Sequence, residues 1–143
     1  MIVTLRDVSP QNRDRLAELL ADYLFEFDGR TEPYPYLNAY WEEPERLPLL
    51  IQAGNEAVGL CLIRRRDHCW SIAEFSVVPD RRRSGVGAAA VEEVALRAAS
   101  EGAAYLEAKV HPDNHGGLAF WLAMGFAEVK PPESGVTVTR RPL

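Results

Sequence analysis

The sequence predicts a mixed α/β fold in which one mixed sheet carries helices on both faces. Alternating apolar and polar stretches are typical of strands, apolar residues at helical spacing are typical of helices, and the two kinds of segment intermix along the chain. The chain has 143 residues, enough for one hydrophobic core. We therefore expect residues 1–143 to form a single domain.

The N-terminal third begins with a predicted strand over residues 2–5, where apolar and polar residues alternate. Ser9-Pro10 favours a helix start, with serine as the N-cap and proline in the first turn. Leucine and aromatic residues at helical spacing continue this helix, and Asp28-Gly29 ends it. Residues 30–47 contain three prolines and are predicted as loop or short helix.

The remaining two thirds alternate strands with two helices. Strands are predicted over residues 47–53, 57–63, 69–78, 104–110, 126–130 and 136–140. Helices are predicted over residues 86–99 and 117–124, and glycines follow both. The resulting order is β–α–(α)–β–β–β–α–β–α–β–β.

The charge balance bears on the partners. The net charge is −5, which disfavours a nucleic-acid partner because a phosphate backbone needs a basic footprint. We interpret Arg64-Arg65-Arg66 as a solvated hairpin turn and Arg81-Arg82-Arg83 as a ligand contact. No apolar run is long enough to span a bilayer, and the N-terminus lacks a signal-peptide pattern. We expect a cytoplasmic protein without a membrane partner, with Cys61 and Cys69 reduced.

The junction between residues 72 and 90 carries the most chemistry. A predicted buried strand, Ile72 to Val78, runs into a tight loop with Gly85 and Gly87 and then into a helix start. Such a junction presents free backbone N–H groups at the positive end of a helix dipole, which binds phosphate groups. Glycine lets these nitrogens approach a ligand that a Cβ would block.

Two motifs in this part of the chain resemble those of a known family. Arg82-Arg83-Ser84-Gly85-Val86-Gly87, preceded by Val77-Val78-Pro79-Asp80, resembles the Arg/Gln-x-x-Gly-x-Gly/Ala signature of the GCN5-related N-acetyltransferases (GNAT). Asn114, Phe120-Trp121 and Met124-Gly125-Phe126 resemble the second motif of that family. The resemblance covers essentially the whole chain. It implies the acyl-CoA N-acyltransferase fold, with a mixed, mostly antiparallel sheet flanked by helices.

The resemblance also implies a donor and its binding site. Acetyl-CoA would be the cosubstrate, and no metal would be needed. The pantetheine arm would pair with the backbone of Val77 and Val78, and Asn114 would contact CoA. The pyrophosphate would bind the backbone N–H groups of Arg82, Arg83, Ser84, Gly85, Val86 and Gly87.

Asn114 and the two nearby histidines have simpler interpretations as well. Asp113-Asn114 suits the N-cap of the next helix, which is compatible with a CoA contact. His111 and His115 lie four residues apart, but no carboxylate or cysteine at ligand spacing joins them and Pro112 lies between them. We interpret both as loop residues and not as metal ligands.

Glu74 is the candidate general base. A carboxylate within an apolar strand is unfavourable unless it has a partner or a function. In enzymes that the chain resembles, a glutamate on this strand often relays a proton from the substrate ammonium. The alternative is an exposed or salt-bridged glutamate. Strict alternation places Ile72, Glu74 and Ser76 on one face of the strand, although a β-bulge would reverse the direction of Glu74.

Trp121 departs from the family pattern. The usual residue is a tyrosine that can protonate the leaving thiolate, whereas an indole N–H is no general acid near neutral pH. Trp121 packs on the pantetheine arm or lies in the core beside Phe120 and Phe126. Water or another tyrosine could supply the proton, and the sequence does not rank the candidates Tyr34, Tyr36, Tyr40 and Tyr105.

The acceptor side is predicted from residues 18–45. This segment holds eight acidic residues, one arginine and seven of the thirteen aromatic residues. Acidic and aromatic surfaces attract cations, and the resemblance implies that this segment borders the acceptor pocket. The prediction is a cationic amine, namely a polyamine, an amino sugar or a lysine. The alternative is a solvated helix face with no role in binding.

Together these features predict a small acetyl-CoA-dependent N-acetyltransferase that transfers the acetyl group directly in a ternary complex. No cysteine is placed as an acyl carrier. The main alternative, favoured by Trp121, is a catalytically weak acyl-CoA-binding sensor or regulatory module. Another acyl-CoA donor or an oxygen acceptor is a second alternative, and nucleic-acid binding is the most distant. A homodimer formed through sheet edges or C-terminal strands stays open.

Overall fold

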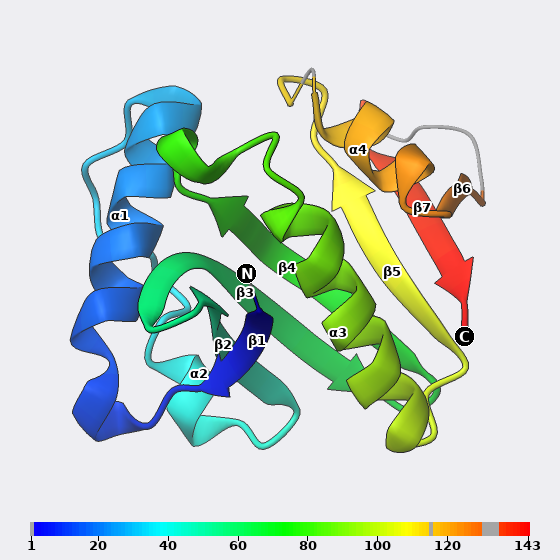
Figure 1. Ribbon diagram of the computed structural model, residues 1–143, viewed down its shortest axis with the longest axis horizontal. Coiled ribbons are helices and arrows are strands. Elements are labelled where there is room, and N and C mark those ends of the chain that lie inside the picture. Colours follow the sequence, from blue (N-terminus) through cyan, green and yellow to red (C-terminus); the bar gives the residue numbers. More distant parts are fainter. Residues whose placement is uncertain (1, 115, 130–134) are drawn as a thin grey trace.

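The computed structural model describes residues 2–114, 116–129 and 135–143. Over these residues the chain forms one seven-stranded sheet in the order β1-β2-β3-β4-β5-β7-β6 (Figure 1). The strands are β1 (Val3–Asp7), β2 (Arg46–Ala53), β3 (Glu56–Arg66), β4 (Cys69–Val77), β5 (Tyr105–Val110), β6 (Ala127–Glu128) and β7 (Thr137–Pro142). The α-helices are α1 (Asp14–Asp28), α2 (Ala39–Glu42), α3 (Val86–Ser100) and α4 (Gly117–Ala123), and two 3-10 turns are η1 (Pro10–Asn12) and η2 (Pro79–Arg81).

The sheet is mixed and mostly antiparallel, which confirms the predicted fold class. Within the described residues, every pair of neighbouring strands is antiparallel except β4 with β5, which is parallel. β4 pairs with β5 only from Cys69 to Ile72, whereas β5 pairs with β7 along its whole length. Beyond Ile72, therefore, β4 has no described strand beside it on the β5 side, and the sheet opens there.

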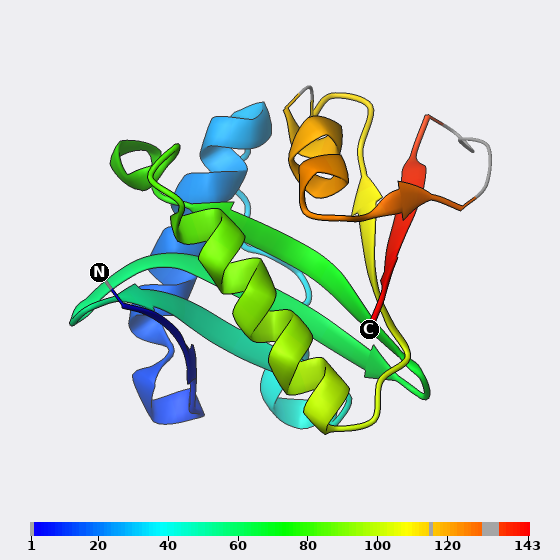
Figure 2. The same ribbon diagram turned by 45° about the vertical axis from the view of Figure 1, so that its right-hand side comes forward.

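Helices cover both faces of the sheet (Figures 1 and 2). On one face, α1 buries Leu16, Leu20 and Leu24 in a cluster with Leu60 and Leu62 of β3. These leucines are the residues whose helical spacing predicted α1, because residues three and four apart share one face of a helix.

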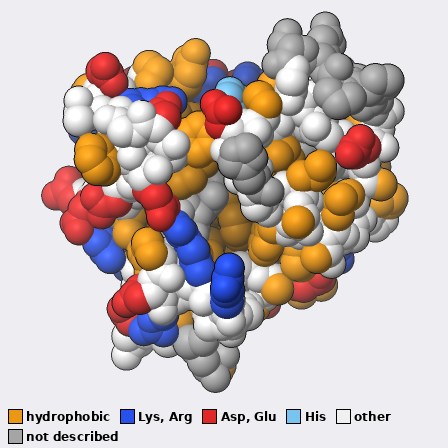
Figure 3. Space-filling model, turned by 90° about the horizontal axis from the view of Figure 1, so that it is seen from above, with side chains coloured by type: hydrophobic (Ala, Val, Ile, Leu, Met, Phe, Trp, Pro, Cys, Tyr) orange, Lys and Arg blue, Asp and Glu red, His pale blue; other side chains and the backbone are white. Residues whose placement is uncertain are grey.

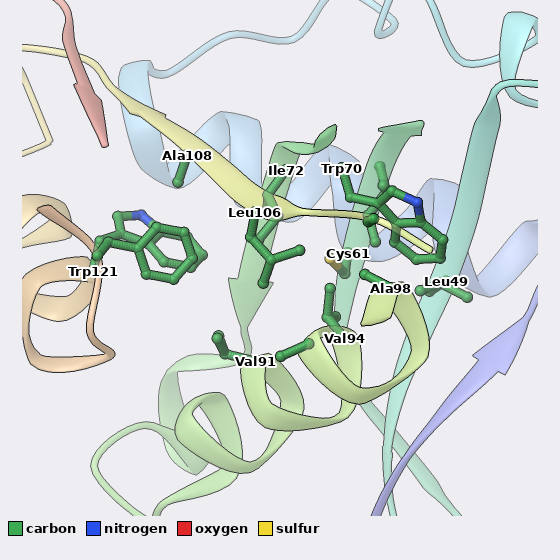
Figure 4. Packing of buried hydrophobic residues seen from close by; sticks show 14 of the residues in the cluster. Leu49, Cys61, Trp70, Ile72, Val91, Val94, Ala98, Leu106, Ala108 and Trp121 are labelled. Atoms are coloured by element: carbon green, nitrogen blue, oxygen red, sulfur yellow. The ribbon is translucent and has the colours of Figure 1, made fainter. Parts of the chain in front are cut away.

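The opposite face carries α3 and α4. In Figure 4, Val91, Val94 and Ala98 of α3 point toward the sheet, where Ile72 of β4 and Leu106 of β5 meet them. The small alanines of α3 let the helix lie close to the strands. At the start of α3, Val86 and Ala90 pack with Val77 at the open end of β4.

The predicted boundaries of two segments need correction. Pro10–Asn12 forms a 3-10 turn and α1 begins only at Asp14, because Ser9 accepts a hydrogen bond from the side chain of Asn12 (3.1 Å) and caps no α-helix. α1 ends as predicted, with Gly29 in the left-handed region at φ +74°. The strand predicted over residues 126–130 contains only Ala127–Glu128 among the described residues, and its predicted end, Lys130, lies outside them.

Both cysteines are free thiols, as predicted. Cys61 is buried opposite Phe75, and Cys69 is half-buried opposite Arg66, so the two do not face each other. Among the helices of the described residues, none combines the length and the apolar character that a membrane crossing needs.

Candidate active site

A cleft of about 790 Å³ opens where β4 leaves β5. Tyr23 and Phe27 of α1 form one wall, and Phe120 and Trp121 of α4 form the other. Between them lies Phe75 of β4, whose ring centroid is 5.6 Å from that of Phe120 and 5.4 Å from that of Trp121. Figure 3 looks onto this end of the molecule, where the surface is hollowed between hydrophobic side chains. The volume suits a small ligand, for which roughly 300–1,000 Å³ is usual.

The glycine loop and the start of α3 form one end of this cleft. Gly85 has φ +88° and precedes the first residue of α3. An ideal Cβ on Gly87 would lie 3.3 Å from the Phe120 ring, so glycine keeps the cleft open there. The first N–H groups of α3 have no partner within the helix, and Gly87 and Ala88 line the cleft. This end can therefore bind an anion.

The other residues of the predicted phosphate loop occupy different positions. Arg83 is exposed and lines the cleft. Val86 is buried in the core, and the Ser84 hydroxyl donates to the Arg81 carbonyl. Neither Val86 nor Ser84 is among the residues that line the cleft.

The Arg82 side chain links α1 to the end of β4. Its Nε donates to the Val77 carbonyl at 2.8 Å, and its two terminal nitrogens donate to the Glu26 carboxylate at 2.8 and 2.6 Å. The hydrogen bond from Arg82 lowers the pKa of Glu26, and burial of Glu26 partly opposes this. A phosphate bound at this loop would share the guanidinium with Glu26.

The backbone that faces the open edge of β4 differs by one residue from the backbone predicted to pair with the pantetheine arm, namely that of Val77 and Val78. Val78 donates its N–H to the Val58 carbonyl on β3 at 2.8 Å, so this group points away from the cleft. Because backbone groups alternate along a strand, those of Phe75 and Val77 face the open side. Val77 lines the cleft, while Val78 lines a smaller neighbouring pocket of about 140 Å³.

Glu74 lies at the opposite end of the open segment, and a β-bulge sets its direction. Leu62 of β3 pairs with Glu74, but the next residue, Ile63, pairs with Ile72, so Ala73 is an extra residue in β4. Glu74 therefore shares the α1 face of the sheet with Leu62, whereas Ile72 lies on the α3 face. The prediction that Ile72 and Glu74 share a face is wrong, because strict alternation fails at the bulge.

The surroundings of Glu74 raise its proton affinity. Burial raises the pKa of Glu74 to about 7, while the positive charge of Arg30 and a hydrogen bond with Tyr23 hold it from rising further. Burial likewise raises the pKa of Tyr23 and Tyr34, and the negative charge of Glu74 adds to both. A carboxylate with a pKa near 7 can accept a proton at neutral pH and release it again.

Comparison with known proteins agrees with this geometry. The acetyltransferase (GNAT) family profile matches residues 13–126. The chain belongs to the GNAT acetyltransferase family. It is therefore an acetyltransferase by family, and its sheet and helices form the acyl-CoA N-acyltransferase fold. No curated protein matches it in sequence.

Solved structures share the fold at low identity. An acetyltransferase from Thermus thermophilus is 24% identical with a TM-score of 0.80, and the match covers 100% of this chain and 98% of that one. The ribosomal-protein-S18-alanine N-acetyltransferase of Escherichia coli is 18% identical (TM-score 0.73; 99% and 94% covered). PaiA N-acetyltransferase of Thermoplasma acidophilum, solved in complex with coenzyme A, is 14% identical (TM-score 0.79; 100% of both chains covered).

Trp121 occupies the tyrosine position of the GNAT motif. Its side chain is only 7% exposed, and its ring centroid lies 5.0 Å from those of both Phe120 and Phe126. It also lines the cleft. Core packing and a surface for a bound ligand therefore coexist in this residue.

Asn114 also lines the cleft, but it is not the N-cap of α4. That position belongs to Gly116, which has no side chain to cap the helix. An ideal Cβ on Gly117 would come within 2.4 Å of the Asn114 amide nitrogen, so glycine at this position leaves room for the amide. The arrangement favours a ligand contact for Asn114 over the capping interpretation.

Of the two predicted loop histidines, His115 lies outside the described residues. His111 packs edge-on against Phe27 with ring centroids 5.7 Å apart, and its Nδ1 accepts the Asp113 N–H at 3.2 Å. Over residues 2–114, 116–129 and 135–143, no three His, Cys, Asp or Glu residues gather as metal ligands.

Arginines neutralise part of the acidic segment. Asp28 pairs with Arg30 at 2.7 Å, and Glu26 pairs with Arg82 at 2.6 Å. Glu18 and Glu43 pair with arginines as well. The negative charge that reaches the site is thus smaller than the composition of residues 18–45 suggests.

The sequence pattern included Tyr23 and Glu26 in the acidic and aromatic segment at residues 18–45, but it gave neither residue a role of its own. Tyr23 has the helical spacing of the core residues of α1, and the pattern placed it with them. Its hydroxyl was the available signal, because a buried phenol needs a hydrogen-bond partner. Glu26 gave no separate signal, since an acidic residue on a helix is ordinarily solvated.

Proposed function

We propose that this chain is an acetyl-CoA-dependent N-acetyltransferase that moves an acetyl group directly to the primary amine of a small cationic molecule or of a lysine. One observation carries the proposal: the cleft at the open edge of β4 has an anion-binding helix start at one end and, beyond its inner end, a carboxylate with a pKa of about 7. A CoA thioester requires a site for its phosphate groups, and an amine requires a base that takes its proton.

The donor would bind along the cleft. Its pyrophosphate would accept hydrogen bonds from the backbone N–H groups of the loop at residues 82–87, with Arg83 nearby. The pantetheine arm would lie along the open edge of β4, where the backbone groups of Phe75 and Val77 face away from β3, and against Asn114 and Trp121 on the other wall. Arg82 already donates to the Val77 carbonyl. The coenzyme A bound by the Thermoplasma protein of the same fold supports an acyl-CoA donor.

The acceptor would enter from the α1 side, where Glu74 lies. Glu74 takes one proton from the substrate ammonium, and the neutral amine attacks the thioester carbonyl. Tetrahedral collapse then expels the CoA thiolate. Neither cysteine is placed to carry the acetyl group, because Cys61 is buried and Cys69 lies at the far end of β4. This arrangement supports direct transfer.

A cationic acceptor is supported by Asp22, Glu32 and Glu74 on this side, together with the aromatic wall of α1. The proposed enzyme acts as one unit over residues 1–143, in the cytoplasm, without a metal, a nucleic acid or a membrane. A pairing of two copies stays open.

An amine panel tests the proposal. Purified protein is given acetyl-CoA with diamines, polyamines, amino sugars, lysine peptides, neutral alcohols and anionic amino acids, and thiol release is followed. We expect turnover with cationic amines. Faster turnover with neutral or anionic acceptors would contradict the cationic assignment. Binding of acetyl-CoA without turnover of any acceptor would instead favour an acyl-CoA-binding sensor module. The observation behind that alternative is Trp121, which lacks the hydroxyl of the tyrosine usual at this position.

A further inference from the structure

The leaving thiolate needs a proton, and the family's usual donor position holds Trp121. Among the described residues that line the cleft, Tyr23 is the tyrosine. The four tyrosines considered from sequence, Tyr34, Tyr36, Tyr40 and Tyr105, are not part of that lining. Tyr23 belongs to α1 and Trp121 to α4, the two helices that form the walls of the cleft.

Tyr23 also lies near the candidate base. The bulge at Ala73 turns Glu74 toward α1, and Tyr23 packs in the same cluster as Leu62, the β3 partner of Glu74. The two groups lie close enough for each to act on the pKa of the other. Tyr23 thus both lines the cleft and lies near the group that receives the proton of the amine.

We propose that Tyr23 donates the proton to the departing CoA thiolate and is itself reprotonated by Glu74. This inference rests on the proposed function. Glu74 first accepts a proton from the ammonium. When the carbon–sulfur bond breaks, sulfur takes the bond pair and the Tyr23 proton, and Tyr23 takes the proton held by Glu74. The second nitrogen proton passes to solvent, so the net reaction releases one proton and restores both residues.

The charges around Tyr23 suit this role. Burial raises its pKa most, the negative charges of Glu74 and Glu26 raise it further, and Arg30 opposes them. Arg82, which is paired with Glu26, lines the same cleft as Tyr23. Tyr23 therefore stays protonated through neutral pH. So weak an acid is an effective donor only when a second proton arrives at the same time, and Glu74 supplies it.

Kinetics of Tyr23→Phe test the proposal, with the best cationic amine from the panel as acceptor. We expect kcat to fall about 100-fold with little change in the KM for acetyl-CoA, since a general acid contributes on the order of 10²–10⁴. Tyr36→Phe is the matched control, because Tyr36 is 56% exposed and away from the cleft; its kcat should equal that of the wild type. Calorimetric binding of acetyl-CoA by Tyr23→Phe shows that the variant is folded.

A second measurement separates proton donation from packing. Because the pKa of wild-type Tyr23 is raised, Tyr23 should give no falling limb at mildly alkaline pH. With 3,5-difluorotyrosine at position 23 the phenol is more acidic, and a falling limb should appear at high pH. A profile without that limb would overturn the proposal, and so would an undiminished kcat in Tyr23→Phe. If the wild type binds acetyl-CoA but acetylates no amine, the proposed function itself fails. If the wild type acetylates an amine and Tyr23→Phe does so at the same rate, the proposed function stands and only the role of Tyr23 is wrong.

Discussion

At the scale of single residues, the chemistry depends on Glu74 and on what buries it. Burial against α1 raises its pKa to about 7, well above the ordinary value of 4.5. Arg30 acts on Glu74 through its charge, but its guanidinium is already bound to Asp28 at 2.7 Å. Glu74 thus keeps a proton affinity suited to a base at neutral pH.

Replacement of Glu74 by glutamine should lower kcat/KM for the amine about 100-fold, because the variant has no group to take the ammonium proton. In the wild type, the rate should rise with pH through a midpoint near 7, and the variant should lack that limb. Rates measured between pH 5 and 9 check this. Glu93→Gln, an exposed site on α3 that does not line the cleft, is the control. A wild-type profile without that limb, or one that Glu74→Gln retains, would count against the assignment.

The same substitution has a predicted effect on stability. The folded-state pKa of Glu74 is raised, so its protonated form is favoured by folding, and this contribution is lost as pH rises from about 4.5 through about 7. Glutamine avoids that loss. We expect Glu74→Gln to unfold with a free energy close to that of the wild type at pH 5 and roughly 2 kcal/mol higher at pH 8. Urea denaturation at the two pH values measures it, and a difference independent of pH would refute it.

At the scale of elements, β4 and the start of α3 create the site. The motif at residues 72–90 correctly predicted a strand, a glycine loop and a helix. It could not predict the direction of Glu74, because the bulge at Ala73 arises from pairing with β3 and leaves no local sequence signal. Nor could it show that Val78 pairs with Val58, since hydrogen-bond direction along a strand depends on the register of its neighbour.

A larger residue at position 87 should obstruct the cleft. In Gly87→Val, the Cβ would already lie 3.3 Å from Phe120, and the added methyl groups would fill space beside the anion-binding N–H groups. We expect affinity for acetyl-CoA to fall at least 10-fold in a folded protein. Gly102→Asn is the control: it too changes a glycine at a helix end, but with φ +89° and no atom within 4 Å of an added Cβ. Unchanged affinity in Gly87→Val would exclude this loop as the donor site.

The Arg82–Glu26 pair should affect binding more than stability. Both side chains are more than 40% exposed, so Glu26→Gln should change the free energy of unfolding by less than about 1 kcal/mol. It should tighten acetyl-CoA binding severalfold, because a bound pyrophosphate no longer competes with a carboxylate for Arg82. Calorimetry against Glu18→Gln, which alters an ion pair of α1 remote from the cleft, tests this. Weaker binding in Glu26→Gln would contradict it.

At the scale of the whole molecule, the pattern of apolar residues predicted a mixed α/β fold and the order of its elements, whereas the mostly antiparallel sheet was implied by the resemblance to the GNAT family. The order of strands and helices follows from alternation and helical spacing, and the glycines after α1, α3 and α4 end those helices. The site was less predictable because it joins α1, β4 and α4, which lie far apart in sequence. Tyr23 and Trp121 line the same cleft because the sheet opens between β4 and β5.

Calorimetry of acetyl-CoA binding tests the central claim most directly. The wild-type protein should bind one acetyl-CoA in the micromolar range, and ligand at 100 times Kd should raise the free energy of unfolding by about 2.7 kcal/mol. A folded variant that combines Gly85→Ala and Gly87→Val should not bind. If the folded wild-type protein binds neither acetyl-CoA nor CoA, the loop is only a helix start and the proposed donor site is wrong.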